Sequence, residues 1–311
     1  MAKKRTKLVL FLLALLVITA CTQEKKIGGA FAGGTTGLGA NFVENEPPER
    51  VLDNNAEEFL VTISLFNDGE SDVGVRNARI TLVGIDAKDF QIKDMTKTNE
   101  NLIRGVSKER DQVIPGDIEE VSFDAKYKND LDADFNAIIG ANMCYKYGTR
   151  AVSNLCLKRE IGGRQSTGDI CLVDESKSIE SSSAPVQITN LIERPVGKNS
   201  LRVMFDIENA GAGVVYEKGA FATGSCYEDK KREDRVNVDV SMVGKNLNFK
   251  CSKLDNKASG SVKLIDGRTT VSCEASTTSL QETAFESQLN INLDYVYKDY
   301  IETNVIVESI G

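Results

Sequence analysis

The sequence contains no histidine and no tryptophan among its 311 residues. The lack of histidine excludes Ser-His-Asp and Cys-His catalytic arrangements, an imidazole base near neutral pH and a histidine-ligated zinc. A C-x-x-C pair, a G-x-S-x-G nucleophile elbow and a P-loop are also missing from the sequence. Its 46 acidic residues include no pair that stands out as a catalytic acid and base. We therefore expect a protein that is not an enzyme.

Acidic residues outnumber basic ones. The net charge is −8, and no basic run longer than Lys230-Lys231-Arg232, which lies between acidic residues, follows Lys25-Lys26. This acidity argues against nucleic acid as a partner and against electrostatic binding to anionic lipid. Aromatic residues make up only 6% of the chain, so a stacking surface for sugars is not expected either.

The N-terminus carries the most specific signal in the sequence. A basic start, MAKKRTK, is followed by the uncharged apolar run LVLFLLALLVITA and then by Cys21. This order is typical of a secretory signal peptide, and the run is short for a membrane span of about 20 residues. The segment VITAC resembles the lipobox of prokaryotic lipoproteins, which implies a lipid on Cys21 and a place on the extracytoplasmic face of the cell membrane. An ordinary signal peptide or an uncleaved anchor is the alternative.

The remaining cysteines point to the same compartment. An even number of cysteines in an exported chain indicates disulfide bonds. The segment YKYGTRAVSNL is interpreted as one hairpin between two cysteines, and VKLIDGRTTV as another, with Asp-Gly as its two-residue turn. The expected pairs are Cys144–Cys156, Cys251–Cys273 and, by elimination, Cys171–Cys226.

One short pattern occurs twice. LFNDGESDV at 65–73 and IENAGAGVV at 207–215 each follow a segment in which apolar and polar residues alternate. Alternation with a period of two is typical of a strand with one face on a core and the other in water. Asn-x-Gly is turn chemistry, because both residues tolerate left-handed backbone. The repeat indicates an equivalent strand and turn in each of two domains.

Composition divides the chain into five parts. Gly-rich and Pro-Pro segments near the start favour a flexible tether, and a Gly- and Ser-rich stretch favours a connector between domains. The first domain is expected to contain strands at 58–66, 76–84, 117–126, 135–147 and 153–159, and short strands recur in the second. The predicted parts are a signal peptide (1–20), a lipid-anchored tether (21–54), a first β-sandwich (55–161), a connector (162–184) and a second β-sandwich (185–311).

The repeated strands carry a family resemblance. FLVTISLFNDGESDV and LRVMFDIENAGAGVV resemble the adhesion-related domains called CARDB. This resemblance implies tandem immunoglobulin- or fibronectin-like sandwiches of a prokaryotic surface protein, and therefore an all-β fold. TLVGIDAKDFQI and CYKYGTRAVSNLC are similar to uncharacterised surface lipoproteins of small-celled archaea.

Three features are candidates for a binding site. Asp130, Asp132 and Asp134 alternate in NDLDADFN, where their carboxylates could converge on calcium; a solvated loop is the favoured interpretation. The long polar segment 93–116 is the best candidate for a functional loop. Tyr295, Tyr297 and Tyr300 could form a contact patch, but the favoured interpretation is that either Tyr295 with Tyr297 or the opposite face with Val296 packs the core.

Together these features predict a non-enzymatic surface lipoprotein that acts as a spacer, an adhesin or an assembly and interaction module. Its partners would be the membrane, through Cys21, and an envelope or surface protein. The alternative is a lipoprotein that binds a soluble ligand, with calcium as its cofactor, and serves an envelope complex. A hydrolase that uses two carboxylates ranks third.

Overall fold

The computed structural model describes residues 29–110, 112–163, 170–221, 230–244 and 247–311. Within these ranges every regular element is a β-strand, apart from a 3-10 turn at Lys218–Ala220. The all-β class expected from the alternating sequence is therefore confirmed. No helix among the described residues has the length and apolar character needed to cross a membrane. The predicted leader, Cys21 and Cys226 lie outside the described residues.

Most strands are short, and two are exceptionally long. The strands are β1 (Leu38–Phe42), β2 (Arg50–Leu52), β3 (Phe59–Asn67), β4 (Ala78–Val83), β5 (Thr96–Thr98), β6 (Ser107–Glu109), β7 (Gln112–Ile114), β8 (Ile118–Ala125), β9 (Phe135–Leu157), β10 (Glu175–Ser176), β11 (Glu180–Ser181), β12 (Val186–Pro195), β13 (Ser200–Asn209), β14 (Val214–Glu217), β15 (Arg235–Met242), β16 (Lys250–Cys251), β17 (Ser259–Lys263), β18 (Arg268–Ser276) and β19 (Phe285–Glu308).

These strands form three main sheets and one small hairpin. A three-stranded sheet has the order β1-β3-β8, and a five-stranded sheet has the order β10-β12-β13-β18-β16. A nine-stranded sheet has the path β17-β15-β19-β9-β4-β5, with β2, β11 and β14 attached to the two long strands. Strands β6 and β7 pair only with each other, within the segment 93–116.

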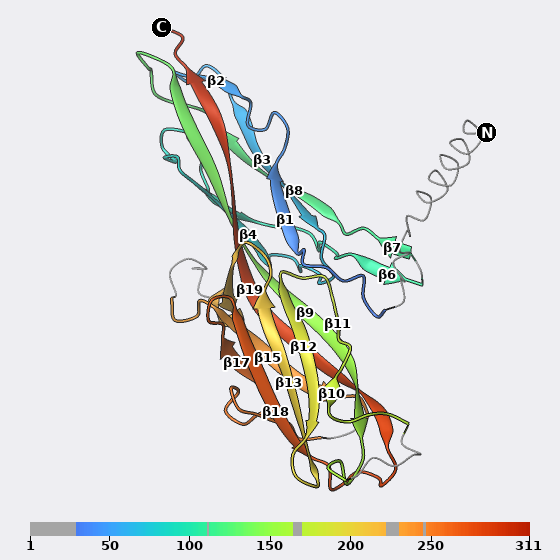
Figure 1. Cartoon of the computed structure of the whole chain (residues 1–311). Coiled ribbons are helices and arrows are strands. Elements are labelled where there is room, and N and C mark those ends of the chain that lie inside the picture. The colour runs from blue at the N-terminus through green and yellow to red at the C-terminus, as the bar shows by residue number, and fades with distance from the viewer. Residues whose placement is uncertain (1–28, 111, 164–169, 222–229, 245–246) are drawn as a thin grey trace, which may run out of the picture.

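The two long strands form a ribbon that runs through the whole molecule (Figure 1). All 23 residues of β9 pair antiparallel with β19, from Phe135 with Val307 to Leu157 with Phe285. One end of the ribbon lies beside the three-stranded sheet and pairs with β2 and β4; we call this part the first lobe. The other end lies beside the five-stranded sheet and pairs with β11 and β15; this is the second lobe. Strands from the predicted ranges 55–161 and 185–311 thus share one sheet.

The apolar cores follow the alternation that the sequence shows. Alternate side chains of β3 and β13 are buried, and the residues between them are mostly half-buried. The buried residues of these two strands are Phe59, Val61, Ile63 and Leu65 in β3 and Leu201, Val203, Phe205 and Ile207 in β13. Burial of side chains of this size is the main favourable contribution to folding.

The hairpin predicted between Cys144 and Cys156 does not exist. Residues 135–157 form a single strand, in place of the two expected at 135–147 and 153–159. Gly148, in the middle of the expected hairpin segment, lies in extended backbone opposite Asp294. A Cβ at Gly148 would lie 3.0 Å from the carbonyl oxygen of Leu293, so the glycine fits a close approach of two strands rather than a reversal of the chain.

Two of the three predicted disulfide pairings are therefore wrong. Cys144 and Cys156 lie twelve residues apart on one extended strand, a separation of about 40 Å. Cys156 instead bonds to Cys171, with 5.6 Å between their Cα atoms. This bond also excludes the pairing of Cys171 with Cys226. Cys144 is disulfide-bonded as well.

The third predicted bond, Cys251–Cys273, is present, but not across the expected hairpin. Asp266 and Gly267 do form a tight turn with positive φ angles of 51° and 76°. The strands on either side of that turn separate, since β17 joins the nine-stranded sheet and β18 the five-stranded sheet. The bond instead links neighbouring strands, because β16 pairs Cys251 directly with Cys273.

Candidate functional site

The first Asn-x-Gly segment lies against the middle of the ribbon. Asn67, at the end of β3, is almost completely buried. Its side-chain amide donates to the carbonyl oxygens of Ser71 (2.8 Å) and Ile103 (3.2 Å). Its side-chain oxygen accepts a hydrogen bond from the hydroxyl of Tyr147, at 2.9 Å. The asparagine therefore closes its own turn and also binds a tyrosine of β9.

The second Asn-x-Gly segment repeats this arrangement on the other long strand. The amide of Asn209 donates to the carbonyl oxygen of Gly213 at 2.8 Å, four residues ahead as in the first copy. The hydroxyl of Tyr297, on β19, lies 3.3 Å from the side-chain oxygen of Asn209 and accepts from the backbone N–H of Gly213 at 2.8 Å. The repeat in the sequence thus marks two equivalent places where a turn binds the ribbon.

The glycine of each motif makes room for the tyrosine. Neither Gly69 nor Gly211 has a positive φ, so backbone freedom is not the reason for glycine at these positions. A Cβ on Gly69 would collide with the Tyr147 hydroxyl and with the backbone of Thr36. On Gly211 a Cβ would collide with the Tyr297 hydroxyl.

Four tyrosines meet where the two lobes join. Tyr145 pairs with Tyr297 across the ribbon, and Tyr147 pairs with Tyr295. The rings contact one another at centroid distances of 5.5 to 6.4 Å. We call these residues the tyrosine junction. Tyr295 and Tyr297 are buried, whereas Tyr300 is exposed.

The tyrosine junction is electrically neutral. Burial raises the pKa of Tyr297 to about 12, despite the hydrogen bond from Gly213. Burial raises the pKa values of Tyr145, Tyr147 and Tyr295 further. All four hydroxyls keep their protons at any physiological pH, so they act as hydrogen-bonding and packing groups and not as acids or bases.

Buried carboxylates that the sequence does not single out hold several loops in place. Glu70, in the first motif, accepts hydrogen bonds from the backbone N–H groups of Ala32, Gly33 and Ser183 at 2.7 to 2.9 Å. It therefore joins residues 32–33, inside the range predicted as a tether, to Ser183, inside the range predicted as a connector. No local pattern marks this role, because its three donors come from two distant segments.

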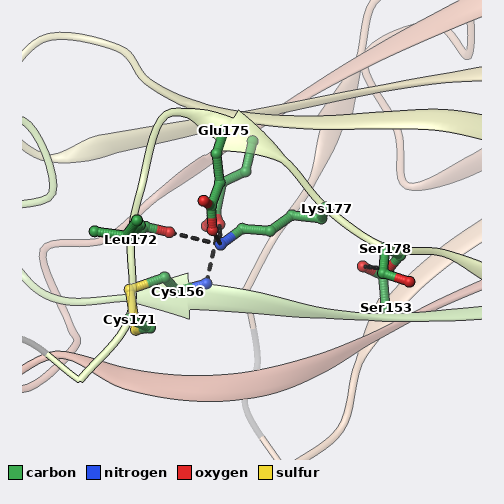
Figure 2. Close-up of polar contacts among 8 residues, drawn as sticks. Ser153, Cys156, Cys171, Leu172, Glu175, Lys177 and Ser178 are labelled. Atoms are coloured by element: carbon green, nitrogen blue, oxygen red, sulfur yellow. Dashed lines mark hydrogen bonds and ion pairs between the residues drawn. A yellow bond between two sulfur atoms is a disulfide. The ribbon is translucent and has the colours of Figure 1, made fainter.

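Among the described residues, the most perturbed acidic group is Glu193 of β12, which is fully buried. Its Oε2 accepts from the backbone N–H of Cys156 (3.0 Å) and lies 3.2 Å from the Nζ of Lys177. Its Oε1 is buried with no hydrogen-bond partner. Figure 2 shows that Lys177 reaches toward Glu175 and the carbonyl oxygen of Leu172, next to the Cys156–Cys171 disulfide.

Burial raises the pKa of Glu193 to about 7, although the hydrogen bond from Cys156 and the charge of Lys177 act against this shift. Burial lowers the pKa of Lys177, but its contacts with Glu175 and Glu193 outweigh that effect and leave the pKa raised. Glu193 therefore changes its charge near neutral pH while the lysine stays protonated. The arrangement ties β9 to β12 and responds to pH.

The structure does not assemble the candidate calcium site. Asp130, Asp132 and Asp134 are all exposed. Asp134 lies 3.8 Å from Arg50 and accepts a hydrogen bond from the N–H of Ser309. Among the described residues no group of three or more acidic or cysteine side chains is placed to hold a metal ion.

Comparisons with known proteins leave the chain without a family. No family model and no curated protein matches the sequence. Among solved structures, it is similar to the secreted serine protease VesC from Vibrio cholerae, with 8% identity and a TM-score of 0.21 over 86% of this chain and 51% of that one. The chain thus spans about half the length of that protein. A TM-score of this size is below that of a shared fold, so function is argued from the site alone.

Proposed function

We propose that the protein is a non-enzymatic spacer and interaction module of the cell envelope, held by a lipid on Cys21 at the extracytoplasmic face of the membrane. In this proposal each lobe is an immunoglobulin-like sandwich, and the ribbon joins the two into one rod. The ribbon is the observation that carries the proposal. Its 23 paired positions correspond to about 75 Å of continuous strand.

Rigidity supports the role as a spacer. Two domains joined by a flexible linker move independently, and a single exposed strand between them would bend. Here two paired strands cross from one lobe to the other, and the tyrosine junction packs on them at the crossing. A turn from each half of the chain is hydrogen-bonded to that junction. The lobes should therefore keep a fixed distance.

Disulfides support the location outside the cytoplasm. Cys156–Cys171 and Cys251–Cys273 are bonded, and Cys144 is bonded too. Disulfides of this number form and persist in oxidising compartments. The anchor itself is argued from the sequence before Cys21.

One experiment tests the anchor. The intact mass of the native, membrane-extracted protein should correspond to a chain that begins at Cys21 and carries added lipid. Six alkylated thiols should appear only after reduction. A retained leader with freely alkylated thiols would refute both the anchor and the exported location.

A second experiment tests the spacer. Dyes on Asp132→Cys and Thr283→Cys, at opposite ends of the ribbon, should report one narrow energy-transfer population in single-molecule measurements. A control pair on Asp132→Cys and Glu120→Cys, both in the first lobe, gives the width expected from dye motion alone. A broad or multiple distribution only for the end-to-end pair would show that the lobes move, and would refute the spacer whatever the outcome for the anchor.

A further inference from the structure

The first lobe has an open sheet edge, whereas a short strand covers part of the equivalent edge in the second lobe. In the second lobe, β18 pairs with β13 on one side and with β16 on the other, where Cys251–Cys273 fixes the contact. In the first lobe, β8 pairs with β3. Within the described part of the chain no strand pairs with the other edge of β8. An unpaired edge presents a row of backbone groups that can bind another strand.

The hydrogen-bond pattern between β3 and β8 shows which backbone groups of β8 are available at this edge. Thr62 of β3 directs its N–H and C=O away from β8, because they bond to Glu46 and Val43. Its partner Ser122 therefore belongs to a pair without backbone hydrogen bonds, and directs its own N–H and C=O outward. Because the direction of the backbone groups alternates along a strand, Glu120 and Asp124 also direct their N–H and C=O groups outward.

A groove runs beside the open edge. It has a volume of about 1270 Å³ and lies between β8 and the segment 96–103. Three apolar side chains on its walls are exposed: Val75 (52%), Leu102 (43%) and Ile118 (68%). A second hollow of about 490 Å³ continues along β8 past Phe123. Alternating apolar side chains of an added strand would fill such hollows.

Lys97 occupies the edge in the unbound protein. Its Nζ donates to the carbonyl oxygen of Ser122 at 2.6 Å and lies 5.2 Å from the ring centre of Phe123. A lysine that caps a free edge is a common protection against unwanted strand pairing. It also means that a partner has to displace this contact.

The charges on β8 identify the kind of partner. Its solvent-facing side carries the exposed Glu120 and Asp124. If two copies paired antiparallel through β8 with Ser122 at the centre, Glu120 of each copy would face Asp124 of the other, and like charges directly opposite are destabilising. A strand that carries Lys or Arg at those positions is attracted instead.

We propose that the edge of β8 is a strand-addition site for an extended segment of an envelope protein in which apolar residues alternate with Lys or Arg. This inference rests on the interaction role proposed above and gives it a location, but it does not depend on the lipid anchor. The partner segment would pair with the outward groups of β8, place apolar side chains in the groove and place its basic side chains beside Glu120 and Asp124.

Binding of labelled eight-residue peptides, measured by fluorescence anisotropy with the full chain, tests the proposal. The basic peptide alternates Val with Lys, the acidic peptide has Glu in place of Lys, and a third is the basic peptide with N-methyl groups on every second amide. The basic peptide should bind saturably, and the other two at least tenfold more weakly. Equal binding of the basic and acidic peptides, or no binding of the basic one, would overturn the proposal.

Two variants locate the binding. The exchange of Glu120 and Asp124 for lysine leaves the ladder with β3 intact and should reverse the preference to the acidic peptide. Lys97→Ala should tighten binding of the basic peptide several-fold, because the carbonyl of Ser122 is then free. Unchanged preference in the first variant would place binding elsewhere and overturn the proposal. A concentration-dependent dimer of the wild type that dissociates on adding the basic peptide would overturn it in favour of a second copy.

The two proposals can fail separately. If the mass of the native protein shows no lipid while the peptide preferences hold, the strand-addition site stands and the anchor falls. If lipid is present and the peptides do not discriminate, the anchor stands and the site falls.

Discussion

The two lobes use the same Asn-x-Gly motif, but they bury it to different depths. Asn67 is fully enclosed, and its amide binds two carbonyl oxygens, one of them on the distant residue Ile103. Asn209 is half-buried, and its side chain binds only within its own turn and to Tyr297. The motif therefore determines the contact with the tyrosine. Distant segments that cover the turn determine how much this contact contributes to the stability of the fold.

The largest expected difference concerns the glycines. Gly69→Ala should lower the free energy of unfolding by about 4 kcal/mol, because the new Cβ meets backbone that cannot move aside as well as the Tyr147 hydroxyl. Gly211→Ala should cost about 2 kcal/mol, since its closest neighbour is the end of the Tyr297 side chain. Urea denaturation followed by circular dichroism measures both. Tyr297→Phe should partly rescue Gly211→Ala, whereas Tyr147→Phe should not rescue Gly69→Ala; equal costs in the two lobes would contradict the comparison.

The second expected effect concerns the covered edge of β18. Replacing Cys251 and Cys273 by alanine should cost about 3 kcal/mol, because the bond closes a separation of 22 residues. Hydrogen exchange should accelerate at the amides of 272–274 and stay unchanged in β8, which has no such bond. The matched control replaces Cys156 and Cys171, whose loss should leave exchange at 272–274 unaltered. Faster exchange in both lobes would show that the bond supports the whole fold and not one edge.

The asparagines should differ by a smaller amount. Asn67→Ala should cost about 2 kcal/mol, because it removes the acceptor of the buried Tyr147 hydroxyl and a donor to the carbonyl oxygens of Ser71 and Ile103. Asn209→Ala should cost about 1 kcal/mol, since its turn is open to water. Thermal unfolding at several urea concentrations measures both values. A larger loss for Asn209 would reverse the order that burial predicts.

The smallest expected effect is a pH dependence from the second lobe. The pKa of Glu193 is raised from 4.5 to about 7, so the folded state binds this proton more tightly than the unfolded state. Stability from this group is therefore gained as the pH falls through 7 and is lost as the pH rises. Between pH 8 and pH 6 the gain should be about 1 kcal/mol, and Glu193→Gln should abolish it. Glu175→Gln, which also removes a contact of Lys177, should keep the pH dependence. If the pH dependence disappears in Glu175→Gln, the effect belongs to Lys177 and not to Glu193.

Sequence analysis predicts the local parts of the fold well. The alternation in β3, β4, β8 and β13 reports burial directly, and the Asp266-Gly267 turn follows from the left-handed backbone that both residues tolerate. The repeat of Asn-x-Gly correctly indicates equivalent turns. Its tyrosine partners lie 80 and 88 residues further along the chain, so no window of the sequence contains both groups.

The long strands show where sequence analysis fails. The segment YKYGTRAVSNL between two cysteines favours a hairpin, but pairing with β19 holds it in extended backbone. That pairing joins residues 128 to 172 positions apart, which local propensity does not encode. The wrong disulfide pairing of Cys144 follows from this single error. The candidate groups Glu193 and Glu70 also escape detection, because burial by distant segments is what makes them unusual.

The sharing of the two long strands by both lobes has a consequence for the order of folding. Each lobe contains half of β19, so neither can complete its sheet before residues 285–308 have left the ribosome. Contacts of such high sequence separation form slowly. The two lobes are therefore expected to reach their full stability together, when β19 pairs with β9.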